Sequence, residues 1–368
     1  MGKPQVVLIV DGPDPDNFAA MLVALSRATC FTLVAVIMTG RPVSSDHQLP
    51  PHAYMAHASI RVQRDNALHA KGILMRHGGE HVAVFQGGQA TYSGVPHRMH
   101  IHERVTDVYD DMHAAHSLDG DLRHAVPFLA GLEGPLHFIC GGPLTDLAYL
   151  IDQPMLHGKL GIATAQLGMF GTNPEVKTFI GGNKQFNVSA DPAAAHRVLF
   201  EYPGAFYMVP TDVTKDPSIA LHGPDDAAAL SDSSANKELA AMYRRAWPHM
   251  WAKMGPNGSP AHLHDVHPVE LMDELLCLEP PHHSSFTPHG GDAVGRYTVS
   301  PAAIGYVPHQ AHDVEKWGEI RLIDNPAEST IAWPRFLAAG CDYRLQRQIF
   351  GSYLDAVNTP LPLPAEVP

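Results

Sequence analysis

Val6-Val-Leu-Ile-Val-Asp-Gly-Pro-Asp-Pro-Asp-Asn17, followed directly by Phe18-Ala-Ala-Met-Leu-Val-Ala-Leu25, decides the fold of this chain. The first five residues are apolar without alternation, which is typical of a buried parallel strand. Oxygen-bearing side chains follow within seven positions, at Asp11, Asp14, Asp16 and Asn17, and an apolar helix comes next. Open α/β sheets bind ligands beyond the carboxyl ends of their strands, and crowded carboxylates repel one another unless a cation or proton joins them. The stretch therefore predicts a divalent-metal site, with Ca²⁺ as the favoured ion.

Apolar strand-like runs recur along the chain, and helical patterns fall between many of them. The expected strands are Val6–Val10, Phe31–Met38, Val82–Phe85, Leu136–Cys140, Leu160–Leu167 and Ala205–Val209. The expected helices include Phe18–Ser26, Asp65–Met75, Pro143–Ile151 and Pro192–Phe200. This alternation predicts an α/β fold with an open, mainly parallel sheet flanked by helices. Right-handed crossovers then bring the loops after these strands to one edge, where we expect the active site.

We expect a single domain over residues 1–357, because no internal repeat or shift of composition divides the chain. Two segments, near 41–60 and 89–121, lack clear periodicity and look like insertions, which are typical of lids or binding loops. Residues 358–368 contain four prolines and are expected to form an irregular tail. Asp226–Asn236 is polar and is expected to be a surface connection.

The bulk properties limit the classes of partner. The 368 residues carry a formal net charge of −13, which argues against a nucleic-acid backbone or an anionic membrane as partner. The four cysteines form no CxxC pair, so no zinc knuckle or redox motif is indicated. No apolar run reaches the roughly 18 residues of a membrane span, and no secretory leader is recognisable. A reducing cytoplasm is the default location.

The acidic loop alone leaves its chemistry open. It could be a simple turn with a helix cap, because Asp and Asn are favoured at that position. A haloacid-dehalogenase-like phosphatase would also place an aspartate after its first strand. Such an enzyme would have a second Asp two residues later, where this chain has Pro13.

Four further segments place polar residues at strand ends or helix starts. They are Phe138-Ile-Cys-Gly-Gly-Pro-Leu-Thr-Asp146, Gln185-Phe-Asn-Val-Ser-Ala-Asp-Pro192, Asp212-Val-Thr214 and Leu263-His-Asp-Val-His267. In this order and at these spacings, the set resembles the inosine–uridine-preferring nucleoside hydrolase family. The family pattern is an Asp-rich first loop, Gly-Pro-Leu-Thr-Asn, Glu-Phe-Asn with Asp-Pro-x-Ala-Ala, Asp-Val-Thr and a late His-Asp-Pro. The resemblance covers roughly residues 6–272.

The resemblance implies Ca²⁺-dependent hydrolysis of the N-glycosidic bond of a ribonucleoside or modified nucleoside, which releases base and ribose. Asp11 matches the family's calcium-binding residue that deprotonates water, and His264 matches the histidine that assists the departing base. The implied metal ligands are Asp11, Asp16, Asn17, the backbone carbonyl of Gly141, and Asp265. Asn17 departs from the family's usual Asp, and the loop is one residue longer than the common form, so Asp14 is a further candidate ligand.

The resemblance also implies the residues that hold the ribose. Asp16 matches a contact to the ribose hydroxyls, and Asn187 matches the ribose-binding asparagine. Gln185 stands where the family often has Glu, and the neighbouring Lys184 suggests a rim that accepts a 5′ substituent. Arg41 follows strand two near the usual Asn. The aromatic residues Tyr243, Trp247 and Trp251 could stack on a base, but their helical spacing favours a core role.

The expected partner is a small-molecule nucleoside, and the resemblance weakly implies a homo-oligomer, either dimer or tetramer. The competing hypothesis is a non-catalytic nucleoside- or sugar-binding protein with a weakened metal site. Asn17, Gln185 and Arg41 favour that alternative, whereas Asp11 and the His264–Asp265 pair favour catalysis.

Overall fold

The structure is a computed structural model of the whole chain. It describes residues 2–12, 14–26, 28–40, 59–90, 92, 115–171, 185–217, 220–223, 225–250, 260–277, 292–294, 296–302, 304–306, 320–322, 335–341 and 346–357. The predicted tail at 358–368 and most of the two predicted insertions lie outside the described residues.

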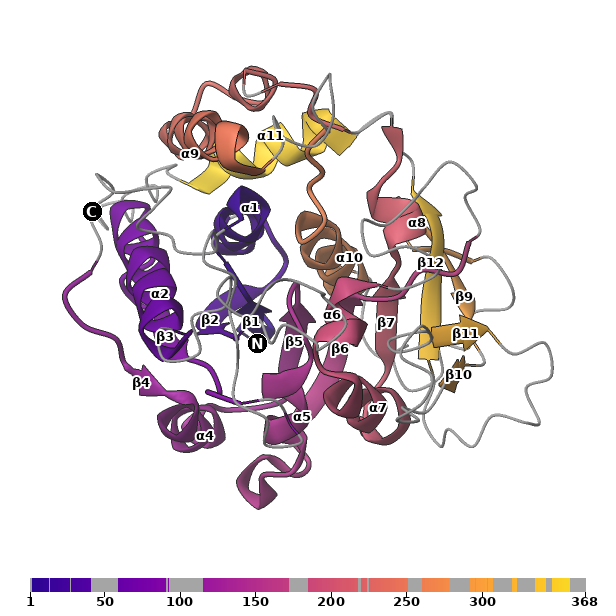
Figure 1. Cartoon of the computed structure of the whole chain (residues 1–368). Helices are drawn as coiled ribbons and strands as arrows, with labels where there is room; N and C mark the ends of the chain where they lie inside the picture. The colour runs from indigo at the N-terminus through magenta and orange to yellow at the C-terminus, as the bar shows by residue number, and fades with distance from the viewer. Residues whose placement is uncertain are drawn as a thin grey trace, which may run out of the picture.

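A ten-stranded sheet runs through the molecule (Figure 1). Its order is β4 (Gly120–Asp121), β3 (Ala83–Gln86), β2 (Thr32–Met38), β1 (Gln5–Val10), β5 (Leu136–Cys140), β6 (Leu160–Gln166), β7 (Phe206–Val209), β12 (Arg335–Cys341), β9 (Tyr297–Pro301) and β8 (Asp292–Val294). The strands from β4 to β12 pair in parallel, whereas β12–β9 and β9–β8 pair antiparallel. The expected open, mainly parallel sheet is confirmed, and the six predicted strands lie within one residue of their predicted ends.

Helices cover both faces of this sheet (Figure 1). One layer contains α1 (Pro15–Leu25), α2 (Ser59–Arg76), α9 (Ser234–Met250), α10 (Val266–Cys277) and α11 (Gln346–Val357). The other contains α4 (Leu122–Gly131), α5 (Thr145–Ile151) and α7 (Pro192–Glu201). Short elements complete the chain: α6 (Phe186–Ala190), α8 (Thr211–Thr214), the 3₁₀ turns Pro154–Leu156 and Ala227–Ala229, and the antiparallel pair β10 (Ile304–Tyr306) and β11 (Ile320–Leu322).

The unalternating strand β1 is apolar throughout because both of its faces are covered. Leu8 and Val10 pack into the core beneath α1, whereas Val7 and Ile9 pack into the core on the opposite side. β1 lies between β2 and β5, and the chain order of the strands reverses on its two sides. This is the topological switch point at which open α/β sheets bind ligands, and the loops after β1 and β5 both end there.

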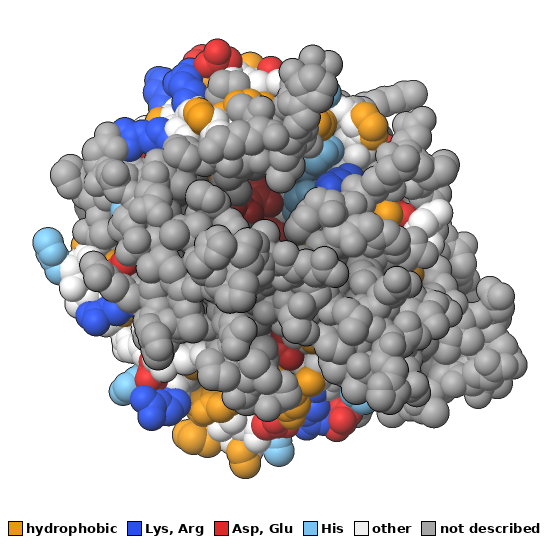
Figure 2. Space-filling model, in the orientation of Figure 1, with side chains coloured by type: hydrophobic (Ala, Val, Ile, Leu, Met, Phe, Trp, Pro, Cys, Tyr) orange, Lys and Arg blue, Asp and Glu red, His pale blue; other side chains and the backbone are white. Residues whose placement is uncertain are grey.

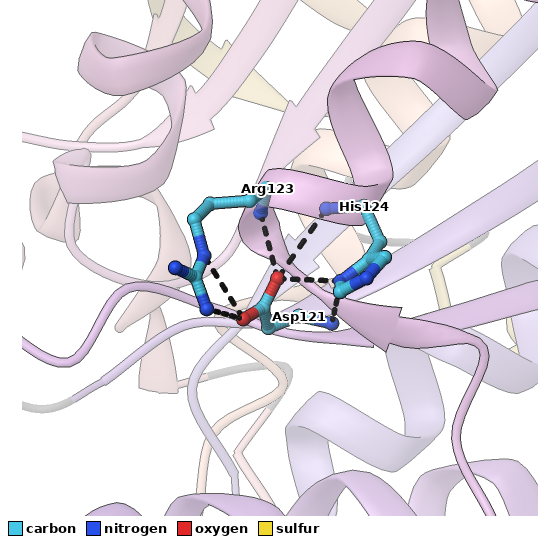
Figure 3. A network of polar contacts seen from close by, with 3 residues as sticks. All are labelled: Asp121, Arg123 and His124. Carbon is cyan, nitrogen blue, oxygen red and sulfur yellow. Dashed lines mark hydrogen bonds and ion pairs between the residues drawn. The ribbon is translucent and has the colours of Figure 1, made fainter.

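The last residue of the second predicted insertion, Asp121, forms a helix cap. Asp121 ends β4 and caps α4, where its carboxylate accepts hydrogen bonds from the backbone N–H groups of Arg123 (3.0 Å) and His124 (3.3 Å) (Figure 3). The Arg123 side chain also pairs with it at 2.8 Å and is the main cause of the lowered pKa of Asp121. The predicted insertion at 89–121 therefore ends inside regular structure.

Two features differ from the sequence expectations. The predicted surface connection Asp226–Asn236 already contains the start of α9, and Asn236 is fully buried, donating to the carbonyl of Ser231 at 2.5 Å. Cys30 and Cys277, which no spacing motif links, are joined in a disulfide with their Cα atoms 5.5 Å apart. Disulfides are rare in reducing compartments, so this pairing does not favour the default cytoplasmic location.

Candidate active site

The acidic loop after β1 is folded back on itself. Gly12 adopts a φ of +33°, and the side-chain oxygen of Asn17 accepts a hydrogen bond from the backbone N–H of Asp11 at 3.2 Å. Asp14 occupies the N-cap position of α1, but its side chain makes no capping hydrogen bond. Asp11, Asp16 and Asn17 are all buried, with 3%, 8% and 1% of their surfaces exposed. The loop thus keeps its carboxylates at the strand end rather than in solvent.

The glycine turn after β5 brings a second acid to the same place. A Cβ atom on Gly141 would lie 2.6 Å from Cγ of Asp265, and one on Gly142 would lie 2.9 Å from Cβ of Asp11. Both positions therefore need glycine, because any side chain would displace one of the two acids. Asp265 is buried and lies just before α10. Two acids far apart in the sequence, Asp11 and Asp265, therefore lie against this one turn.

The residues that the resemblance assigns to a metal have the chemistry that calcium needs, although among the described residues only Cys30, Asp273 and Cys277 form a group of three such side chains with ligand atoms within 4.8 Å of one another. The carboxylates of Asp11, Asp16 and Asp265 and the carbonyl of Gly141 are hard oxygen donors, which Ca²⁺ prefers. The Gly141 carbonyl accepts a hydrogen bond from Asn187 Nδ2 at 2.9 Å, which leaves its second lone pair for a metal. Asn17 shares its oxygen with the backbone of Asp11, so it supports the loop whether or not it also ligates a metal.

His264 is held by the segment that follows β7. Its Nδ1 lies 2.6 Å from the hydroxyl of Thr214, the last residue of α8. Burial is the main reason that the pKa of His264 lies well below its ordinary value. His267, one turn further along, points elsewhere: it is fully buried, with Nδ1 3.0 Å from the Tyr297 hydroxyl. The two histidines therefore do not share a role.

The predicted ribose-binding residues form a buried amide network. Nδ2 of Asn187 lies 2.9 Å from the backbone oxygen of Gln166 and 2.9 Å from its Oε1. Gln185 donates to the same Oε1 at 2.6 Å and accepts from the N–H of Val188, which makes it the N-cap of α6. Gln166 is the residue that sequence reasoning missed, although its position at the carboxyl end of β6 would have pointed to it.

A further acid, Asp146, contacts the loop that follows β3. It is fully buried at the start of α5, and its Oδ1 accepts from the N–H of Gly88 at 2.8 Å. Burial raises its pKa to about 6. A Cβ on Gly87 would lie 2.1 Å from its Oδ2, so the loop after β3 packs directly on this carboxyl.

Several predicted residues fall elsewhere. Lys184, Arg41 and Trp251 lie outside the described residues. Tyr243 is fully buried and Trp247 packs against the same core, which confirms the core interpretation for these two. Figure 2 shows acidic, histidine and Lys or Arg side chains gathered in one hollow of the surface. No helix among the described residues is long and apolar enough to cross a membrane.

Comparisons with known proteins agree with the family resemblance that the sequence motifs indicate. The family model described as inosine-uridine preferring nucleoside hydrolase matches residues 9–280. A search of curated proteins gives no match. Among solved structures, the chain is similar to a plant nucleoside hydrolase, PpNRh1, with 17% identity over 96% of this chain and 99% of that one and a TM-score of 0.68.

Two other solved structures have the same fold. A purine-preferring ribonucleoside hydrolase from Gardnerella vaginalis is 16% identical over 96% of this chain and 99% of that one, with a TM-score of 0.65. The type III effector protein XopQ, solved in complex with adenosine diphosphate ribose, is 12% identical over 97% of this chain and 94% of that one, with a TM-score of 0.58. At these identities the likeness concerns the fold, whereas the family model covers most of the chain. The chain therefore belongs to the inosine-uridine preferring nucleoside hydrolase family.

Proposed function

We propose that the protein hydrolyses the N-glycosidic bond of a ribonucleoside in a calcium-dependent reaction and releases the free base and ribose. The proposal rests chiefly on the convergence of Asp11 and Asp265 over the Gly141–Gly142 turn. Asp11, Asp16, Asp265 and the Gly141 carbonyl would supply oxygen ligands to a hard cation at the switch point. When bound, Ca²⁺ would lower the pKa of water and hold ribose hydroxyls.

In this proposal each residue has a separate role in the reaction. The carboxylate of Asp11 takes a proton from the attacking water, whose oxygen forms the new bond to C1′. The C1′–N bond breaks, and its electron pair leaves with the base. Asp16 accepts hydrogen bonds from the ribose hydroxyls, and Asn187, which also contacts Gln166, fixes the Gly141 carbonyl that would be a metal ligand. His264, which contacts the Thr214 hydroxyl through Nδ1, assists the departure of the base.

The test is release of reducing sugar from a panel of nucleosides, with and without EDTA. We expect turnover that EDTA abolishes and Ca²⁺ restores. Asp11→Ala should lower kcat by at least about 10²-fold, the lower end of the usual contribution of a general base. Asp232→Asn, at an exposed acid, is the matched control and should leave kcat unchanged. Full turnover by Asp11→Ala would refute the assigned water activation.

A nucleoside- or sugar-binding protein without turnover is the second candidate. The observations that favour it are the Asn17 oxygen bound to its own loop and the Gln185 side chain used as a helix cap. XopQ, in complex with adenosine diphosphate ribose, shares the fold. Calorimetric binding of ribose or a nucleoside without any release of base would support this candidate over hydrolysis. The 5′-substituent hypothesis at Lys184 is tested by comparing a nucleoside with its 5′-monophosphate.

A further inference from the structure

Three side chains that can bind a metal meet at the C-terminal end of α10. They are Cys30, Asp273 and Cys277, and their ligand atoms all lie within 4.8 Å of one another. Asp273 and Cys277 are four residues apart on α10, so they lie on one face of that helix. Cys30 comes from the connection between α1 and β2. Asp265 lies just before the other end of α10, about 12 Å of helix away from Asp273, so this thiol cluster is separate from the acids of the candidate active site.

Two hydrogen bonds orient the carboxylate of the thiol cluster. Oδ1 of Asp273 accepts from the backbone N–H of Cys30 at 2.5 Å, and Oδ2 accepts from the Tyr353 hydroxyl at 2.5 Å. Tyr353 lies on α11, and its backbone carbonyl accepts from Oγ of Ser26 at 2.8 Å. Each carboxylate oxygen has a further lone pair, so Oδ1 can still bind a cation. Ligating carboxylates in metal sites are usually held by hydrogen bonds of this kind.

The charge of Asp273 is buried without a matching cation. Only 5% of the residue is exposed, and burial is the main cause of its raised pKa. Among the residues that the structure describes, no Lys or Arg side chain forms an ion pair with it. Arg296 pairs instead with Glu274 at 2.9 Å and with Glu270 at 3.5 Å. Buried charges in proteins are normally paired or bound to a metal, so a cation would stabilise this carboxylate.

The spacing within the thiol cluster suits a tetrahedral zinc ion. Zinc bonds of about 2.3 Å to sulfur and about 2.1 Å to oxygen place these two ligand atoms about 3.6 Å apart. Sγ of Cys277 lies 3.9 Å from Oδ1 of Asp273. The two sulfurs are joined to each other in the structure, and thiolates are the form of cysteine that binds metals. After reduction, a change of the χ1 rotamer at the exposed Cys277 would separate the sulfurs.

We propose that the reduced protein binds one Zn²⁺ ion through Cys30, Asp273 and Cys277, with water as the fourth ligand. The disulfide accepts two electrons and two protons and becomes two thiols. A phosphine reductant supplies the electrons and becomes a phosphine oxide, whose oxygen comes from water. The two thiols release their protons as they bind the metal. The same cysteines thus form either a disulfide or a zinc site, and thiolate ligands favour zinc over calcium.

The experiment measures metal binding by the full chain before and after reduction. Protein whose disulfide is verified by peptide mapping is treated with a phosphine, transferred to oxygen-free buffer and titrated with Zn²⁺ against a chromophoric chelator. Excess Ca²⁺ is present, so that sites with only oxygen ligands are filled. We expect one Zn²⁺ per reduced chain, bound at least about 100-fold more tightly than by the disulfide form. Co²⁺ in place of Zn²⁺ should give sulfur-to-metal charge-transfer absorption.

Four variants assign the ligands. Cys30→Ser/Cys277→Ser nearly keeps the size of both side chains and should lose the bound Zn²⁺ and the Co²⁺ absorption. Asp273→Asn should weaken Zn²⁺ binding by at least about tenfold, and Tyr353→Phe, which removes only a hydrogen bond to the carboxylate, should weaken it by about tenfold. Cys140→Ala is the matched control, because it removes the buried free cysteine, and it should bind Zn²⁺ as wild type does. Circular dichroism shows whether each variant is folded.

Zinc should also stabilise the reduced protein. At a Zn²⁺ concentration about 100 times Kd, the Tm of the reduced wild type should rise by about 3 °C, whereas the disulfide form should not respond. A reduced wild type without bound Zn²⁺, or full Zn²⁺ binding by Cys30→Ser/Cys277→Ser, would overturn the site. Full affinity in Asp273→Asn would overturn the role of the carboxylate. No nucleoside enters these measurements, so their outcome is independent of the hydrolase proposal.

Discussion

Loss of the Cys30–Cys277 disulfide should lower the thermal stability of the protein by a predictable amount. The bond joins Cys30, two residues before β2, to the last residue of α10, across a sequence separation of 247 residues. The chain-entropy relation gives about 5 kcal/mol for a loop of this length, and measured disulfides typically contribute about 2–4 kcal/mol. Unfolding entropy of about 2.1 cal/mol/K per residue amounts to roughly 0.8 kcal/mol/K for this chain. The expected decrease in Tm is therefore about 3–6 °C.

Neighbouring hydrogen bonds also hold the Cys30–Cys277 region in place. The backbone N–H of Cys30 donates to Asp273 at 2.5 Å, and the Tyr353 hydroxyl donates to the other oxygen of the same carboxylate at 2.5 Å. Because these contacts remain after reduction, we expect reduction to lower Tm without unfolding the protein at room temperature.

The assay is thermal unfolding with and without a phosphine reductant. Wild type should lose about 3–6 °C on reduction, whereas Cys30→Ser/Cys277→Ser should start at the lower Tm and not respond. Peptide mapping without reduction should recover the Cys30 and Cys277 peptides joined. Separate peptides and a Tm that ignores the reductant would show that the two thiols are not bonded. A joined pair in protein from its native source would also indicate an oxidising compartment rather than the expected cytoplasm.

Two further predictions concern the site. Gly141→Ala places a Cβ 2.6 Å from Cγ of Asp265, so we expect at least a tenfold weaker calcium affinity in isothermal titration; wild-type affinity would refute the close approach. Asp146→Asn tests a buried acid whose pKa is raised from 3.8 to about 6. The folded state of the wild type binds more protons between these values, so its stability falls as pH rises through that window and is lower by about 3 kcal/mol above it. In denaturant unfolding, the free energy of unfolding of the variant should therefore rise relative to that of the wild type from pH 4 to pH 7. A difference between the two free energies that does not change with pH would contradict the raised pKa of Asp146.

The sequence predicted the first two-thirds of the sheet well and the last third poorly. Six strands up to Val209 are apolar runs with clear turn residues between them, so these runs located them, whereas the two-residue β4 (Gly120–Asp121) fell inside a predicted insertion. β12 reads Arg-Phe-Leu-Ala-Ala-Gly-Cys, which has little β propensity, and it enters the sheet between β7 and β9. Such a strand is defined by its neighbours rather than by its own residues. The disulfide was missed for a related reason, since partners 247 residues apart leave no spacing motif.

At the site, the sequence identified which polar residues are present better than it identified the partners that they bind. The structure brings Asp11 and Asp265 to one glycine turn, as the resemblance implied for a metal pocket. Gln185 and Asn187 also lie at the site edge, but their amides bond to Gln166. A motif indicates which hydrogen-bonding groups are present, whereas their partners depend on strands that meet only in the folded chain. The position of Gln166 at the end of a predicted strand marked it as a candidate, but its bonds to Asn187 and Gln185 were visible only in the structure.

The position of α1 has a consequence for how the protein is made. This helix is almost entirely buried, and α9, α10 and α11, which pack against it, all come from the last 135 residues of the chain. A ribosome working from the N-terminus therefore exposes an apolar helix and the Asp11 loop long before their cover exists. The outer edge of β7 also waits for β12, which is synthesised more than 120 residues later. The Asp11 loop and α1 are thus covered only after α9, α10 and α11 have been synthesised, and nascent fragments that end before these helices would expose apolar surface.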